Sequence, residues 1–291
     1  MKPAAFEYDS PDSVEEALAL LAEYGDEARV LAGGQSLVPM MNFRLAHPER
    51  LIDLNGLTDL DYVSAKPGSV SIGSMTRQRH LERSSTVRDL CPMISAAVPW
   101  IGHAQIRNRG TLGGSLAHAD PAAELPVVAL ALDARMRLAS ASGERWVDAE
   151  TFFVGYFTTA LDPGELLVEV EFPSTANKTG VAFTEYARRH GDFGLGGAAA
   201  LITLDDDDVC IRAHIALLGA AMVPVRASAA EDILSGRVID TDALQDVFAQ
   251  IESSIDPPAD VHGSSSYRRR IIATMSRTAV KEAAQNARDS S

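Results

Sequence analysis

The first 57 residues carry the hydrophobic pattern of one helix and two short strands. Ser13 and Glu16 have the spacing of a capping box, apolar residues at positions 14, 17, 18 and 21 would share one helical face, and Gly25 ends that helix. Strands are expected at 29–32 and 51–54, with a helical stretch over 37–44 between them. This pattern predicts a first subdomain over residues 1–57.

The next part of the chain mixes strand and helix patterns and predicts a second subdomain over residues 58–175. The expected elements are strands at 70–73 and 166–172, helices over 76–82, 87–101 and 124–132, and a hairpin at 135–147 around Ser142 and Gly143. Pro92 and Pro99 interrupt the middle helix. The 166–172 strand alternates apolar and acidic residues, so we expect it to be half-exposed.

A linker at 173–178 separates a third unit, expected over residues 178–288. Three successive strand-like runs at 182–189, 197–204 and 209–218 predict a three-stranded antiparallel sheet, and three helices follow at 227–234, 241–251 and 265–287. The acidic run 205–208 is interpreted as a solvated turn. A calcium loop would need a glycine and a late glutamate that are missing here.

Composition narrows the possible partners. The 291 residues have a net charge of −14, which opposes binding to nucleic acid or to anionic lipid. The sequence shows neither a membrane-spanning apolar stretch nor a signal-peptide core, so we expect a cytoplasmic protein. Two cysteines cannot hold an iron–sulfur cluster that needs four, and the seven histidines lack metal-ligand spacing, so we expect no metal site.

Two glycine pairs carry the candidate chemistry. The segments Ala32-Gly33-Gly34-Gln35-Ser36 and Thr111-Leu112-Gly113-Gly114-Ser115 each combine paired glycines with hydroxyl residues. Glycine permits close approach of a ligand, and successive amides and hydroxyls can hold an anion such as a pyrophosphate. Either segment alone could be a tight turn. A P-loop is absent, and the glycine-rich run 191–197 precedes a strand rather than a helix, which excludes a dinucleotide fingerprint there.

These strings resemble the FAD motifs of one family. Residues 32–39, with Met41 and Arg44, are similar to the first FAD motif of the medium subunits of molybdenum hydroxylases, such as aerobic carbon monoxide dehydrogenase, nicotine dehydrogenase and bacterial xanthine dehydrogenase. Residues 107–115 and 120–126 resemble the second motif, and residues 187–193 a third. Order, spacing and length agree over nearly the whole chain.

Three positions depart from the family pattern. Ser115 stands where Asn is common, Glu124 where Asp is frequent, and Glu185 where some relatives have Lys. A hydroxyl still donates and the Glu124 carboxylate is kept, but a role for Glu185 cannot be carried over.

The resemblance implies an α+β fold: a two-subdomain FAD-binding fold of the vanillyl-alcohol oxidase type, followed by a C-terminal domain of a three-stranded antiparallel sheet with three helices. FAD would be held noncovalently between the subdomains. Glu124 would serve polar groups of the nucleotide, Ile101 and Leu161 would lie near the cofactor, and Phe193 would lie beside the isoalloxazine ring. The implied cofactor-binding residues are Ala32, Gly33, Gly34, Gln35, Ser36, Leu37, Ile101, Thr111, Gly113, Gly114, Ser115, Glu124, Leu161 and Phe193.

The resemblance also implies partners. A large subunit would carry the molybdenum cofactor and a small subunit two [2Fe–2S] clusters, in a dimer of heterotrimers. Electrons would pass from the clusters to FAD and then to an external acceptor. Catalysis in this chain is therefore electron transfer, and no acid, base or metal ligand is assigned. Arg107 and Arg109 are candidates for phosphate pairing or surface ion pairs, and His118 follows the second segment.

Two other functions remain open at this point. A self-sufficient flavin oxidase would need its own substrate domain, and a nonenzymatic nucleotide-binding module would need neither redox partner nor flavin. The hydroxylated substrate and the electron acceptor are also open.

The glycine assignment predicts that Gly114→Val abolishes FAD retention without unfolding, because a side chain would enter the space expected for phosphate. The FAD-to-protein absorbance ratio of the purified variant measures this. Normal FAD content would reject the assigned pocket.

Overall fold

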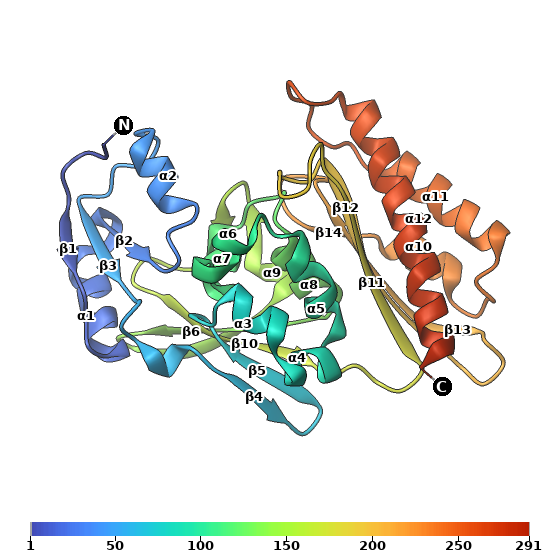
Figure 1. The fold of residues 1–291 in the computed structure, drawn as a ribbon, viewed down its shortest axis with the longest axis horizontal. Coiled ribbons are helices and arrows are strands. Elements are labelled where there is room, and N and C mark those ends of the chain that lie inside the picture. Colours follow the sequence, from blue (N-terminus) through green and yellow to red (C-terminus); the bar gives the residue numbers. More distant parts are fainter. Residues whose placement is uncertain (1, 291) are drawn as a thin grey trace.

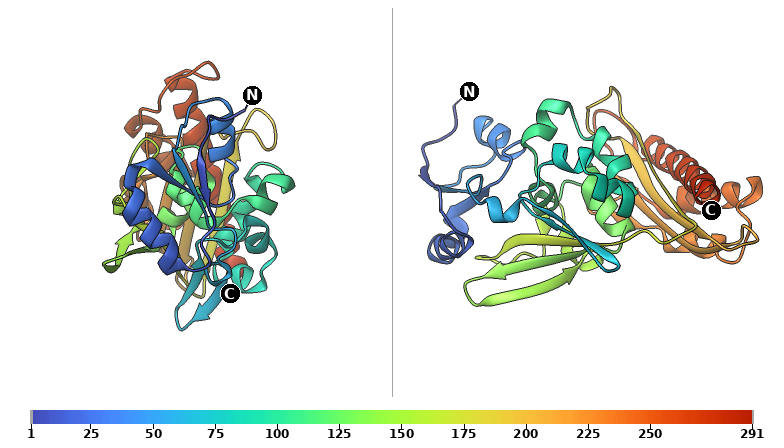
Figure 2. Two further views of the ribbon diagram at one scale, coloured as in Figure 1. Left: turned by 90° about the vertical axis from the view of Figure 1, so that its left-hand side faces the viewer. Right: turned by 60° about the horizontal axis from the view of Figure 1, so that its bottom comes forward.

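The structure, a computed structural model, describes residues 2–290. Three units follow one another along an elongated molecule, with the N-terminal unit at one end and the C-terminal sheet and helices at the other (Figures 1 and 2). Each unit has a sheet of its own, and the described residues form three buried apolar clusters, two of which extend across the boundaries between units. Among the described residues, no helix combines the length and the apolar character that crossing a membrane requires.

The N-terminal unit is a small parallel sheet with a helix against it. Strands β1 (Glu7–Asp9), β3 (Arg50–Asp53) and β2 (Ala28–Leu31) pair in that order, and α1 (Val14–Tyr24) packs on them. The Ser13 hydroxyl accepts a hydrogen bond from the Glu16 amide at 3.1 Å, which confirms the predicted N-cap. The Glu16 carboxylate accepts from the Asp12 amide, one residue before the position that a capping box would use.

The central unit contains a five-stranded antiparallel sheet covered by short helices. The strand order is β4 (Val63–Lys66), β5 (Ser69–Gly73), β10 (Leu166–Pro173), β6 (Arg135–Ser140) and β7 (Gly143–Asp148). The helices are α3 (Gln78–Arg83), α4 (Ser85–Leu90), α5 (Pro92–Ala97), α6 (Ala104–Arg109), α7 (Leu112–His118), α8 (Glu124–Ala131) and α9 (Ala149–Phe152). The helical segment predicted over 87–101 is broken at Pro92 and Pro99, as expected.

Further short elements complete this part of the chain. They are α2 (Leu37–Asn42), the 3-10 turns η1 (Gly25–Glu27), η2 (Thr58–Leu60) and η3 (Val98–Trp100), and the two-stranded β8 (Phe153–Gly155) and β9 (Thr158–Thr159).

The half-exposed position predicted for the strand at 166–172 is wrong. Strand β10 lies at the centre of the five-stranded sheet and is buried along almost its whole length, including Glu169. Burial alone would raise the pKa of Glu169, but a hydrogen bond from Tyr62 and the charges of Arg137 and Lys66 hold it below its usual value. The acidic residue that suggested a solvent face is thus accommodated inside by dedicated partners.

The C-terminal unit packs α12 (Ser265–Asp289) on one face of an antiparallel sheet, and α11 (Thr241–Ser254) packs against α12. The sheet order is β11 (Thr179–Tyr186), β12 (Gly196–Leu204), β13 (Cys210–Leu218) and β14 (Val225–Arg226), so the sheet has four strands rather than the predicted three. Strand β14 is only two residues long, too short for an alternating pattern to reveal it. The three predicted helices are present, the first of them being α10 (Ser228–Leu234).

Strand β11 approaches α12 closely at Gly180. A Cβ atom built at this position would lie 2.0 Å from the Ala283 carbonyl oxygen and 2.2 Å from the Ala287 amide nitrogen. Both atoms belong to the helix backbone, so no side chain can rotate away to make room. The contact requires glycine on the strand and small residues on the facing side of the helix.

This contact predicts that Gly180→Ala destabilises the protein by about 3 kcal/mol, the upper part of the range for overpacking. Urea unfolding measures the change. Gly56→Ala is the matched control, because the nearest atom to its Cβ would be the Pro11 oxygen at 4.0 Å. Equal stability of the two variants would contradict the packing described.

Candidate functional site

A single cleft of about 1010 Å³ is walled by residues from all three units. The N-terminal unit supplies the segment after β2, the central unit supplies α7 and the start of α8, and the C-terminal unit supplies Gly191 to Phe193. All fourteen residues singled out in the sequence line this cleft. Its volume is at the upper end of ordinary ligand pockets, which suits an extended dinucleotide.

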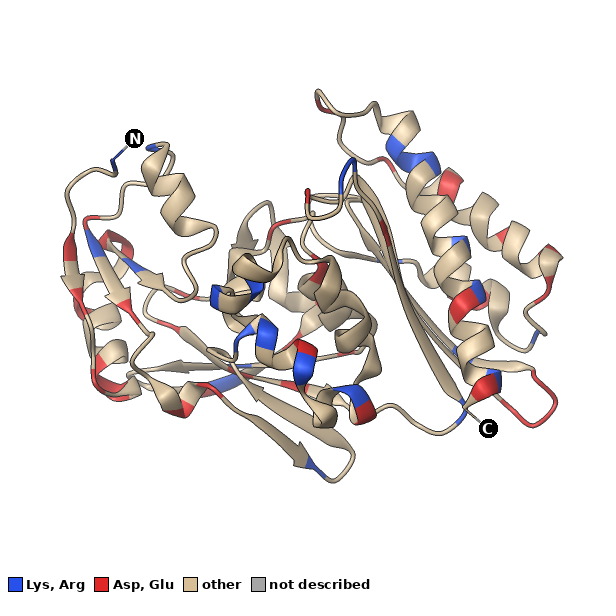
Figure 3. Ribbon diagram, viewed as in Figure 1, with Lys and Arg blue, Asp and Glu red and all other residues tan. Residues whose placement is uncertain are grey.

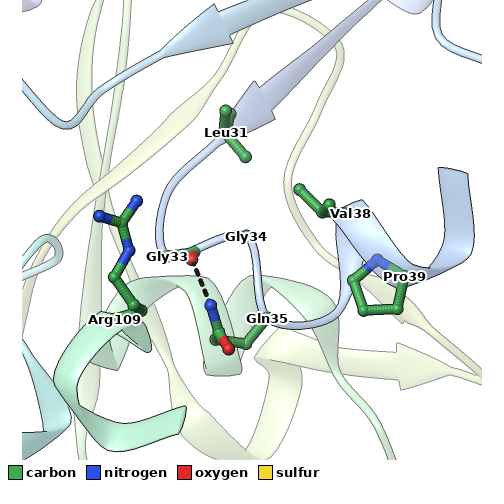
Figure 4. A pocket seen from close by; sticks show the side chains of 7 residues that line it. All are labelled: Leu31, Gly33, Gly34, Gln35, Val38, Pro39 and Arg109. Carbon is green, nitrogen blue, oxygen red and sulfur yellow. Dashed lines mark hydrogen bonds between the residues drawn. The ribbon is translucent and has the colours of Figure 1, made fainter. Parts of the chain in front are cut away.

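The first glycine segment offers open amides. Strand β2 ends at Leu31, Gly34 adopts a φ of 71°, and α2 begins at Leu37. Within residues 2–290, the backbone amides of Gly33, Gly34, Gln35 and Ser36 donate to no protein oxygen. The Gln35 side chain folds back to donate to the Gly33 carbonyl at 3.0 Å (Figure 4). Four successive amides without protein partners form the kind of concave donor set that binds anions.

The second segment differs from the expectation of a second amide nest. It is the first turn of α7, and the Thr111 hydroxyl caps it by accepting from the Gly114 amide at 3.0 Å. The Gly113 amide donates to the Ser74 carbonyl at 2.8 Å, and the Leu112 and Ser115 amides donate to the carbonyls of Thr76 and Thr111. These amides are already satisfied, so the segment can offer a ligand chiefly its hydroxyl groups and the space that two glycines leave open.

The two glycine segments pack directly on each other. A Cβ atom at Gly33 would lie 2.4 Å from the Arg109 carbonyl oxygen, and one at Gly114 would lie 2.7 Å from the Thr111 hydroxyl and 3.3 Å from the Ala32 Cβ. The Gly114→Val side chain would therefore wedge the segments apart as well as fill the cleft.

Asn55 and Arg77 brace this junction. The Asn55 side-chain amide donates to the Ala32 carbonyl at 2.9 Å. The Arg77 guanidinium donates to the Asn55 side chain at 2.6 Å and to the Arg109 carbonyl at 2.5 Å. Neither residue was expected to contribute. Asn55-Gly56 reads in the sequence as an ordinary turn, and its partners are distant along the chain.

Known proteins share this architecture throughout. Residues 4–175 match the family described as the FAD binding domain in molybdopterin dehydrogenase, and residues 181–283 match the CO dehydrogenase flavoprotein C-terminal domain. The chain belongs to this flavoprotein family. It is 44% identical to the 6-hydroxypseudooxynicotine dehydrogenase complex subunit alpha of Paenarthrobacter nicotinovorans, covering 99% of this chain and 97% of that protein.

Solved structures of the family match equally closely. Carbon monoxide dehydrogenase from Hydrogenophaga pseudoflava superposes with a TM-score of 0.96 at 36% identity, covering 98% of this chain and 99% of that one. Quinoline 2-oxidoreductase from Pseudomonas putida 86 gives a TM-score of 0.94 at 38% identity, covering 99% of both chains. The chain is thus an FAD-binding flavoprotein of the medium-chain type found in multi-subunit molybdenum hydroxylases.

In this flavoprotein the two arginines of the second motif have different surroundings. Arg107 is buried on α6, pairs with Glu82 at 3.1 Å and donates to the Ile101 carbonyl at 2.9 Å. These bonds fix the backbone at Ile101 and Gly102, both of which line the cleft. The Arg107 guanidinium is therefore not free to bind a phosphate. Arg109 is exposed and lines a smaller pocket of about 300 Å³ beside Gly33 (Figure 4).

Basic residues gather on the central helices although the chain as a whole is acidic. Arg residues lie on α3, α4 and α6, while Asp and Glu predominate on the N-terminal unit (Figure 3). Helix α6 leads directly into the second glycine segment, and its last residue, Arg109, lines the smaller pocket beside Gly33. Arg109 therefore places a positive charge beside the first glycine segment although the chain has a net charge of −14.

The remaining cleft residues differ in burial. Ile101 and Glu124 are buried, whereas Phe193 is 72% exposed on the C-terminal rim. His118 stacks 5.0 Å from the Phe157 ring, and its burial lowers its pKa, which favours the neutral imidazole. Phe157 has a positive φ of 52° and was not expected in the site, because it lies in a short β8–β9 connection without a recognisable motif.

The Arg107 contacts predict that Arg107→Met lowers stability by about 3 kcal/mol, the cost of leaving one partner of a buried ion pair, and reduces bound FAD. Burial alone would raise the pKa of Glu82, but hydrogen bonds from Arg79 and Arg107 hold it low. Because the pKa of the Glu82 carboxyl is lower in the folded protein than in the unfolded chain, its charge stabilises the fold at pH values above the unfolded pKa. This contribution is lost as the pH falls through the folded pKa, so the difference in unfolding free energy between wild type and variant should shrink in acid.

Urea unfolding at several pH values tests this prediction. Arg79→Met is the control, since Arg79 also pairs with Glu82, at 2.7 Å, but forms no bond to the Ile101–Gly102 backbone. Loss of FAD from the control to the same extent would contradict the positioning role of Arg107.

Proposed function

We propose that the cleft between the units holds FAD, with its pyrophosphate at the open amides of Gly33 to Ser36. The observation that carries this placement is a set of four amides that, among the described residues, have no protein partner and lie beside a cleft of about 1010 Å³. Thr111 and Ser115 would donate their hydroxyls from the facing segment. The close packing of Gly33 on Arg109 fixes the spacing between the two walls.

The other cleft residues would position the rest of the cofactor. Ile101 and Leu161 offer apolar surface for the flavin ring, Phe193 would cover one face of it, and Glu124 would hold polar groups of the nucleotide. FAD, when bound, supplies the two-electron redox chemistry. The protein groups bind and orient the cofactor and limit access of water to it.

We infer that electrons reach FAD from [2Fe–2S] clusters of a small partner subunit and leave to an external acceptor. A large partner subunit would carry the molybdenum cofactor, in a dimer of heterotrimers. Cys91 and Cys210 lie in separate apolar cores, and burial raises their pKa to about 12 and about 11, so neither suits a thiolate cluster.

The cleft rim supports a docked partner. Leu45, Phe157 and Phe193 all line the cleft and are 73%, 44% and 72% exposed. Large apolar side chains grouped around one opening are typical of surfaces that another molecule covers.

A self-sufficient oxidase is less well supported. The four-stranded sheet of the C-terminal unit packs against α12 on one face and against α5 and α8 on the other. Both faces are therefore occupied by the protein itself, and the sheet has no free face on which to build a substrate chamber. We infer that the hydroxylated substrate binds the large partner; relatives carry names such as caffeine dehydrogenase and nicotine 6-hydroxylase.

We also propose domain limits at 1–57, 58–175 and 178–288, an FAD-binding fold of the vanillyl-alcohol oxidase type, and a cytoplasmic location. The family resemblance and the order of the sheets support the first two.

The placement predicts that Ser36→Asp lowers FAD affinity at least tenfold, because a carboxylate beside the open amides repels the pyrophosphate. The FAD-to-protein absorbance ratio after gel filtration measures this. Ser36→Asn is the isosteric neutral control and should retain most of the cofactor. Full FAD content in the aspartate variant would overturn the placement.

A further inference from the structure

Two polar side chains in the wall of the cleft are buried without partners. Ser74, just after β5, is 3% exposed, and Gln78, the first residue of α3, is 5% exposed. Both residues line the cleft. In the part of the chain that the structure describes, neither the Ser74 hydroxyl nor the Gln78 side-chain oxygen has a hydrogen-bond partner. Buried polar groups are costly to leave unpaired, so a ligand that pairs these two would be favoured.

The backbone holds both residues against the second glycine segment. The Ser74 carbonyl accepts from the Gly113 amide at 2.8 Å, and the Gln78 amide donates to the Gly110 carbonyl, just before the segment, at 2.9 Å. A Cβ at Gly113 would lie 2.5 Å from the Ser74 Cβ, and one at Gly110 would lie 2.5 Å from the Gln78 side-chain oxygen. The two unpartnered groups are therefore placed by the same backbone that forms one wall of the cleft.

Gln78 lies close to both parts of the proposed FAD site. Gly110, which Gln78 contacts, is also the residue against which Gly33 packs, at the start of the open amides. On its other side, α3 packs against η3 and α6, and Ile101 lies in the connection between these two elements. The pyrophosphate is proposed at Gly33–Ser36 and the flavin ring at Ile101. In FAD, the ribityl chain joins these two parts.

The chemistry of the two groups favours a ligand with hydroxyls. The side-chain oxygen of Gln78 only accepts hydrogen bonds, and an ionised pyrophosphate has no hydrogen to donate to it. A hydroxyl both donates and accepts, so it can bond to the Ser74 hydroxyl and to either end of the Gln78 amide. The ribityl chain carries a row of hydroxyls, and the ribose of the adenosine half carries others.

We propose that Ser74 and Gln78 bind hydroxyl groups of the FAD ribityl chain. This proposal rests on the placement of FAD in the cleft. The two residues hold the part of the cofactor between the pyrophosphate and the flavin ring, and they take no part in the redox chemistry. Their binding to the ribityl chain fixes how far the ring lies from the glycine segments.

The test compares FAD with analogues that lack one hydroxyl, either on the ribityl chain or on the ribose. Dissociation constants are measured by flavin fluorescence in the assembled complex after its FAD has been removed. We expect the wild type to bind at least one ribityl analogue about tenfold more weakly than FAD, the effect of one buried hydrogen bond. Removal of the ribose hydroxyl should have little effect.

The variants Ser74→Ala and Gln78→Met should each bind FAD about tenfold more weakly than the wild type. In each variant, one ribityl analogue that the wild type disfavours should bind as tightly as FAD, because its missing hydroxyl no longer has a partner to lose. This loss of discrimination is the result that distinguishes a direct bond from an effect on packing.

Ser95→Ala and Gln105→Met are the matched controls. Among the described residues, the Ser95 hydroxyl is likewise buried without a partner, but Ser95 lies on α5, outside the cleft lining. Gln105 is exposed on α6, also outside that lining. Both controls should keep the wild-type affinity for FAD and the wild-type discrimination against the analogues.

Wild-type FAD affinity in both Ser74→Ala and Gln78→Met would overturn the proposal, as would a wild type that binds every ribityl analogue as tightly as FAD. Weaker binding with unchanged discrimination, or no measurable binding in both variants, would assign the two residues to packing of the glycine segment and also overturn it. Discrimination lost only for the ribose analogue would place them at the adenosine half instead. A wrong FAD placement would show separately, as full FAD retention in Ser36→Asp.

Discussion

The close contact between Gly33 and the backbone at Arg109 and Gly110 is the constraint on which the site depends. A Cβ at Gly33 would lie 2.4 Å from the Arg109 oxygen and 2.8 Å from the Gly110 Cα, so only glycine permits the approach. The contact joins the N-terminal unit to the central unit. Asn55 and Arg77 hold it with bonds to carbonyls on both sides. The cleft exists because these two walls are fixed at this distance.

The two walls serve different purposes. The Gly33–Ser36 segment leaves its amides open, whereas the amides of Leu112–Ser115 are spent on the protein itself. The first glycine segment therefore provides amide donors, and the second provides close packing and the hydroxyls of Thr111 and Ser115. Arg107 similarly stabilises the Ile101 backbone rather than meeting a ligand. Much of the site consists of groups that hold other groups in position.

The sequence predicted the local elements well and the long-range pairings poorly. The cap at Ser13, the breaks at Pro92 and Pro99 and the three C-terminal helices depend on nearby residues, and all are observed. Burial of Glu169 and the β14 strand depend on partners far along the chain, so periodicity could not reveal them. Family motifs identified fourteen residues that line one cleft. They gave no sign of the Asn55–Arg77 brace, which arises only where separate units meet.

Hydrogen exchange of the backbone amides shows which of them FAD protects. Exchange is compared between the protein stripped of FAD and the same protein reloaded with it. We expect strong new protection at Gly33 to Ser36 on loading, and little change at Leu112 to Ser115, whose amides are already hydrogen-bonded. Unchanged exchange at Gly33 to Ser36 in the FAD-loaded protein would show that these amides do not hold the cofactor.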